Sequence, residues 1–142
     1  MSRIETHYEL FILLGNTLTI SMPFKMENGE ITCTGMQSLR LSTSFGINNK
    51  QITIGYITDG KANSIDEDSI CGFVDCFASR EYVPDMDEMQ RNCSCNVRKN
   101  LDGRIEYEVS HMNNQTLTPA IALQLFIKYL IIHEKARSNV SF

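Results

Sequence analysis

The residues whose type suits chemistry are first of all five cysteines, Cys33, Cys71, Cys76, Cys93 and Cys95. In an oxidising compartment this odd number predicts two disulfides and one free or intermolecular thiol, whereas in the cytosol all five thiols would be reduced. Cys93 and Cys95 are too close in sequence for an unstrained bridge to each other. A structural zinc site needs about four ligands at set spacing, and the chain has neither a C-x-x-C pair nor a histidine pair.

Three Asn-x-Ser/Thr triplets begin at Asn92, Asn114 and Asn139. Such triplets are acceptor sites for N-glycosylation, which takes place in the secretory pathway. Together with the cysteines they favour an extracellular or secretory-pathway glycoprotein that contains disulfides.

Two acidic clusters could share a calcium ion, because hard cations prefer carboxylate oxygens as ligands. The clusters are Asp66, Glu67 and Asp68, followed by Asp85, Asp87 and Glu88. Neither has the spacing of a known calcium loop, so solvated loop charge is the simpler interpretation. The sequence also lacks G-x-S-x-G, H-E-x-x-H and a glycine-rich phosphate loop, so it predicts neither a metal site nor an autonomous active site.

Length, charge and the apolar runs indicate one domain and argue against a nucleic-acid partner and a transmembrane helix. A chain of 142 residues is expected to fold as one domain. Its 13 basic residues are scattered and outnumbered by 17 acidic ones, which argues against binding to nucleic acid. The longest apolar run, 121–132, is interrupted by Gln124 and Lys128 and is shorter than the roughly 20 residues of a transmembrane helix.

Turn residues divide most of the chain into short strands. Gly15-Asn16, Asn28-Gly29 and Asp102-Gly103 predict β-hairpins. The strand-like runs near and beyond these turns are 31–34, 39–45, 52–56, 70–74 and 104–110. This pattern indicates antiparallel β-structure.

Two segments allow alternative interpretations. Leu10 to Leu14 is either the apolar core of a short signal peptide or a first strand that pairs through Gly15-Asn16. Near the C-terminus, Thr118-Pro119 is typical of a helix start, and the spacing of Gln124 and Lys128 favours an amphipathic helix. The same segment also reads as a buried strand.

Several short motifs spread over the chain carry a family resemblance. They are Ile54-Gly55-Tyr56, Asp66 to Cys71, Glu88 to Asn92, Asp102 to Ile105 and Ala122 to Ile131. Their order resembles the DOMON domain, the dopamine β-monooxygenase N-terminal-like module, and most closely its ferric-chelate reductase-like type. The resemblance covers residues 33–142, about three quarters of the chain.

The resemblance implies an all-β fold, a two-sheet antiparallel β-sandwich of immunoglobulin-like form. Residues 33–142 would form this sandwich, and residues 1–32 would be an N-terminal segment of strands or of signal-like sequence. The family has a short turn and then a strand near its C-terminus. We therefore expect a turn plus a strand over 120–134, against the helical spacing.

Heme-binding members of this family hold a b-type heme between a methionine and a histidine, the ligand pair of electron-transfer cytochromes. In this chain Ala62 stands where the methionine is expected, which makes heme binding doubtful. The family's histidine would fall at about the position of Phe142. The substitutes that the sequence offers as ligands are His133, His111 and Met86.

Two functions follow from this reading. The first is an extracellular, heme-binding electron-transfer domain of a ferric-chelate reductase-like membrane protein, with a membrane-bound redox partner. The second is a cofactor-free β-sandwich module whose end loops recognise a protein or a sugar. Because neither expected axial position is filled, the residues of this chain favour the second function.

Overall fold

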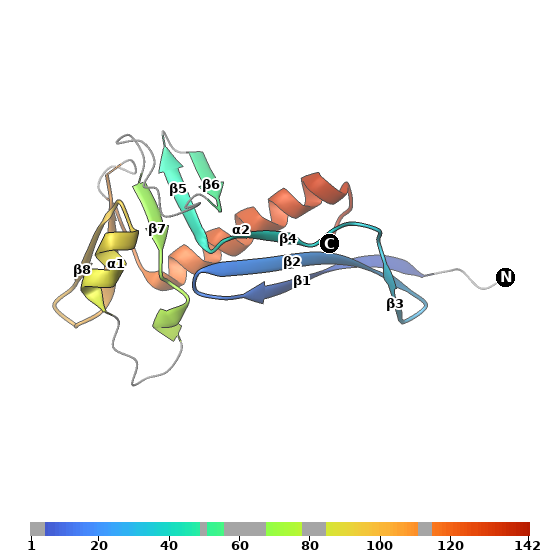
Figure 1. Cartoon of the computed structure of the whole chain (residues 1–142), viewed down its shortest axis with the longest axis horizontal. Helices are drawn as coiled ribbons and strands as arrows, with labels where there is room; N and C mark the ends of the chain where they lie inside the picture. The colour runs from blue at the N-terminus through green and yellow to red at the C-terminus, as the bar shows by residue number, and fades with distance from the viewer. Residues whose placement is uncertain (1–4, 49–50, 56–67, 78–84, 111–114) are drawn as a thin grey trace.

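The computed structural model describes residues 5–48, 51–55, 68–77, 85–110 and 115–142 (Figure 1). The strands of these residues form three antiparallel sheets, accompanied by two α-helices. The predicted β-rich class is therefore confirmed. The immunoglobulin-like arrangement of two facing sheets is not confirmed, because the strands divide into three separate sheets.

The first sheet is built around a long N-terminal hairpin, which extends along the molecule in Figure 1. Its strands are β1 (Thr6–Leu14), β2 (Leu18–Glu27), β3 (Glu30–Cys33) and β4 (Leu39–Ser42). β2 pairs with β1 along one edge and with both β3 and β4 along the other. The predicted turn between β2 and β3 is confirmed, since Asn28 and Gly29 take φ angles of 51° and 80°. Of the two interpretations of Leu10 to Leu14, the described residues show the strand.

The second sheet contains β5 (Ser44–Asn48), β6 (Gln51–Ile54) and β7 (Asp68–Cys71), with β5 between the other two. The single strand predicted over 39–45 is divided at Thr43, where the chain passes from the first sheet to the second. Thr43 is buried at this junction, and its hydroxyl lies 2.5 Å from that of Thr19 in β2. This hydrogen bond holds the two sheets together at the point where the chain crosses.

Two short helices precede the third sheet in the sequence, η1 (Asp75–Phe77) and α1 (Met86–Asn92). Its strands are β8 (Asn96–Lys99), β9 (Ile105–Val109) and β10 (Gln115–Leu117), with β9 in the middle. The predicted hairpin at Asp102-Gly103 joins β8 to β9. As its alternation predicted, β9 buries Ile105, Tyr107 and Val109 on one face.

The C-terminal segment is the helix α2 (Pro119–Ser138), so the expected turn plus strand over 120–134 is wrong. The Thr118 side chain caps the helix start by accepting a hydrogen bond from the Ile121 amide at 3.3 Å. Asn139, with φ of 56°, ends the helix in the left-handed conformation. The buried residues recur at every fourth position, Ala122, Phe126, Leu130 and Glu134. This helical stripe overrode the strand that the family resemblance implied.

Three aromatic rings join α2 to the second sheet in the core. The ring centroids of Phe45 and Phe73 are 5.9 Å apart, and those of Phe73 and Phe126 are 5.7 Å apart. All three side chains are fully buried. Since α2 also contacts β6 and β9, it covers both the second and the third sheet. Within the described part of the chain, neither helix combines the length and the apolar character needed to cross a membrane.

Candidate functional site

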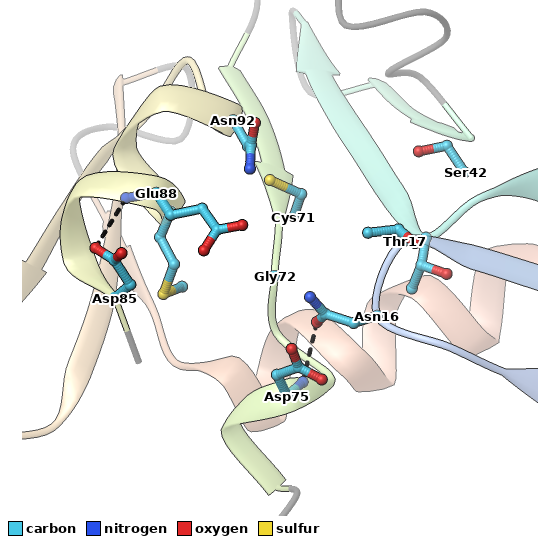
Figure 2. A pocket seen from close by; sticks show the side chains of 11 residues that line it. Asn16, Thr17, Ser42, Cys71, Gly72, Asp75, Asp85, Glu88 and Asn92 are labelled. Atoms are coloured by element: carbon cyan, nitrogen blue, oxygen red, sulfur yellow. Dashed lines mark hydrogen bonds between the residues drawn. The ribbon is translucent and has the colours of Figure 1, made fainter. Parts of the chain in front are cut away.

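A pocket of about 280 Å³ lies where segments from most of the chain converge (Figure 2). Its walls come from the turn between β1 and β2, the junction of β4 and β5, the end of β7, η1 and α1. The lining residues are Asn16, Thr17, Ser42, Thr43, Cys71, Gly72, Asp75, Asp85, Glu88, Met89 and Asn92. Both acidic and neutral polar side chains therefore surround the space.

A hydrogen bond between segments far apart in the sequence fixes the wall of the pocket that the β1–β2 turn and η1 form. The Asn16 side-chain oxygen accepts a hydrogen bond from the backbone amide of Asp75 at 3.0 Å. The bond ties the β1–β2 turn to η1 (Figure 2). Because the Asp75 amide is held, its carboxylate is placed at the edge of the pocket.

The opposite wall is the helix α1, whose N-terminal cap is Asp85. The Asp85 carboxylate accepts hydrogen bonds from the backbone amides of Asp87 at 3.0 Å and Glu88 at 3.2 Å. This cap fixes the first turn of α1. The Glu88 carboxylate extends from that turn into the space beside β7 (Figure 2).

The acidic clusters considered for calcium do not converge in the described residues. Asp68 is buried in β7 and accepts a hydrogen bond from the Ser110 hydroxyl at 3.0 Å. Asp85 is occupied as a helix cap, and Asp66 and Glu67 lie outside the described residues. Within the ranges that the structure describes, no group of three His, Cys, Asp or Glu side chains is placed to hold a metal ion.

The pocket lining is acidic. Asp75, Asp85 and Glu88 supply carboxylates, and none of the lining residues in the described part of the chain is a lysine, arginine or aromatic residue. Amide and hydroxyl groups of Asn16, Thr17, Ser42, Thr43 and Asn92 add neutral donors and acceptors. Such a lining favours a ligand that is rich in hydrogen-bond donors and carries no negative charge.

The residues predicted as heme ligands are not gathered at this pocket. His133 is an exposed residue of α2 that lines a separate hollow with β4 and β6 residues such as Leu41 and Ile54. Met86 lies half-buried at the start of α1, and Figure 1 shows α1 at one end of the fold, well separated from the C-terminal half of α2. His111 and Ala62 lie outside the described residues.

Comparison with protein-family models, curated proteins and solved structures finds no match to the chain. The DOMON resemblance thus stays a prediction. The geometry of the pocket is the observation on which a function can be argued.

The cysteines are free thiols in the described part of the chain. Cys71, Cys93 and Cys95 are buried and Cys76 is half-buried, whereas the side chain of Cys33 lies outside the description. The disulfides expected from sequence therefore stay predictions. Among the pocket residues, Asn16, Thr17, Ser42, Thr43 and Asp75 were not among the site residues expected from sequence. The only sequence signal at Asn16 was its place in the β1–β2 turn.

Proposed function

We propose that the chain is a cofactor-free recognition module that binds a small sugar in the pocket between α1 and the β1–β2 turn. Of the two functions expected from sequence, this is the one that rests on side chains close together in space. The observation that carries it is the convergence of Asn16, Asp75 and Glu88 on one polar cavity.

The size of the cavity supports a small ligand. Its volume of about 280 Å³ is slightly below the roughly 300–1,000 Å³ common for ligand pockets. A single sugar ring is compatible with this space. Its hydroxyls would donate hydrogen bonds to the carboxylates of Asp75 and Glu88 and exchange hydrogen bonds with the amide of Asn16.

The charge of the lining refines the choice of sugar. An amino sugar adds an ammonium group, which the nearby carboxylates would attract. A sugar acid or sugar phosphate would instead meet carboxylates of the same sign. We therefore infer the affinity order amino sugar, then neutral sugar, then acidic sugar. The extracellular location favoured by the sequons fits a sugar-recognition module and belongs to the same proposal.

The test is titration calorimetry of the full chain with a neutral hexose, the matching 2-amino hexose and the matching uronic acid at pH 7. The amino hexose should bind tightest. Glu88→Gln removes one charge from the pocket and should weaken its binding about 5- to 10-fold, the effect of one exposed charge-assisted hydrogen bond. The proposal fails if the uronic acid binds tightest or if none of the three sugars binds.

Asp87→Asn is the matched control. It removes the same charge from the same turn of α1, but Asp87 is exposed and does not line the pocket. Its affinity for the amino hexose should stay within two-fold of the unmodified chain. Equal weakening by both substitutions would mean that general charge, and not contact with Glu88, governs binding.

A further inference from the structure

Three thiols lie together beside the pocket. The sulfur of Cys71, at the end of β7, lies 2.8 Å from the sulfur of Cys93, which follows the last turn of α1. Cys95 is hydrogen-bonded to Cys93 through its own thiol. All three side chains are buried, and Cys71 is the one of the three that lines the pocket.

The segment that carries Cys93 and Cys95 is held firmly against β7. Ser69 and Ser94 exchange two hydrogen bonds, in which each backbone amide donates to the other residue's hydroxyl, at 2.7 and 2.9 Å. These bonds lie next to the Cys71 and Cys93 positions on the two segments. They therefore hold the two sulfurs side by side.

Two further side chains fix the same region. The Gln90 amide donates to the Cys95 carbonyl at 2.8 Å and accepts from the Val97 amide at 2.9 Å, which clamps the turn after α1. The Tyr107 hydroxyl donates to the Cys71 carbonyl at 2.9 Å. The backbone on both sides of the Cys71 and Cys93 sulfurs is thus positioned by side-chain hydrogen bonds.

We propose that Cys71 and Cys93 are a redox pair, which hydrogen peroxide converts into a disulfide that pins β7 to the junction of α1 and β8. A disulfide has a sulfur-to-sulfur distance of about 2.05 Å, so the two sulfurs must approach by only about 0.8 Å from the 2.8 Å observed. The pair does not depend on the sugar proposed for the pocket.

The reaction balances with one peroxide. The Cys93 thiolate attacks a peroxide oxygen, which breaks the O–O bond, forms a sulfenic acid and, after protonation, releases one water. The Cys71 sulfur then loses its proton and attacks the Cys93 sulfur, whose hydroxyl departs as a second water. Two thiols are oxidised to one disulfide, and one peroxide is reduced to two waters. A dithiol reductant reverses the bond by thiol–disulfide exchange.

The roles of the two thiols follow from their surroundings. The pKa of Cys93 is lowered to about 4 because its sulfur is hydrogen-bonded to the thiols of Cys71 and Cys95. The pKa values of Cys71 and Cys95 are raised by their hydrogen bonds to Cys93 and by burial. The lowered pKa favours Cys93 as the thiolate that attacks, with Cys71 as the thiol that closes the bond.

The experiment treats the reduced full chain with one equivalent of hydrogen peroxide and maps its disulfides by mass spectrometry without reduction. The expected product is a crosslink between the peptides of Cys71 and Cys93. Cys71→Ser should abolish it and leave a Cys93 sulfenic acid that dimedone traps. A crosslink that consistently joins other cysteines, or thiol oxidation without a Cys71–Cys93 crosslink, overturns the proposal.

Cys76→Ser is the matched control, since Cys76 is a nearby half-buried thiol that, within the described residues, donates to the Gly72 carbonyl and not to another cysteine. Its crosslink yield should stay within two-fold of the unmodified chain. A second measurement needs no variant. The bond joins residues 22 positions apart in the sequence, so oxidation should raise the Tm by about 5–10 °C, and dithiothreitol should reverse the rise. An unchanged or lowered Tm of the crosslinked chain would contradict the pinning of β7.

Discussion

Glu134 and Arg137 form a bidentate ion pair on α2, and the glutamate side chain is completely buried. The arginine Nε lies 2.6 Å from Oε1 of Glu134, and its Nη2 lies 2.9 Å from Oε2. The third nitrogen, Nη1, donates to the carbonyl of Gln37 at 2.8 Å. The last turns of α2 are therefore fastened to the connection between β3 and β4, a hundred residues earlier in the chain.

Arg137→Ala should lower the free energy of unfolding by about 2–4 kcal/mol, because it leaves the buried Glu134 carboxylate without its partner. Urea unfolding followed by circular dichroism measures the change. Lys135→Ala, at an exposed position on the same helix, should cost less than about 0.5 kcal/mol. Equal losses for the two variants would show that the ion pair does not hold the helix in place.

Local signals in the sequence were reliable predictors of structure. The turns at Asn28-Gly29 and Asp102-Gly103 depend on residues next to one another, so their hairpins could be predicted directly. The helix α2 also had its local signals, the Thr118-Pro119 start and the spacing of its polar residues. The expectation of a strand there came from the resemblance, and the burial of every fourth residue shows that the spacing was the better guide.

The pocket could not be predicted in the same way, because it is made by contacts between distant residues. Asn16 and Asp75, which are hydrogen-bonded to each other in one wall of the pocket, are 59 residues apart in the sequence. The sequence placed Asn16 in a turn and Cys71 near a strand end, but it gave no sign that α1 would face both. The proximity of Cys71 to Cys93 likewise depends on how α1 docks against β7, which no local pattern encodes.

Phe73→Ala should destabilise the chain by about 3–5 kcal/mol, because Phe73 is the middle ring between Phe45 and Phe126 and its loss leaves a cavity in the core. The free energy of unfolding in urea measures this effect. Leu101→Ala is the control, since Leu101 is fully exposed in the β8–β9 turn and should change stability by less than about 0.5 kcal/mol. If Phe73→Ala cost no more than Leu101→Ala, the three rings could not be the link between α2 and the second sheet.

Tyr107→Phe should change how stability depends on alkaline pH. Burial, reinforced by the neighbouring cysteines, raises the pKa of Tyr107, so its phenol stays protonated in the fold. In the unfolded chain a tyrosine ionises near pH 10. The stabilising contribution of Tyr107 is thus complete below about pH 10 and is lost as the pH rises further, by up to about 1.4 kcal/mol per pH unit.

The phenylalanine variant loses the hydrogen bond to the Cys71 carbonyl, so at pH 7 it should be less stable by about 1–2 kcal/mol. Between pH 10 and 11.5 its stability should fall less steeply, because it has no phenol to ionise on unfolding. Urea unfolding under reducing conditions at intervals from pH 7 to 11.5 checks both effects. If the stabilities of the two chains fell in parallel with rising pH, the raised pKa of Tyr107 would be contradicted. If the two stabilities instead converged at high pH, the phenol of Tyr107 would be shown to stay protonated in the fold, beside the Cys71 carbonyl.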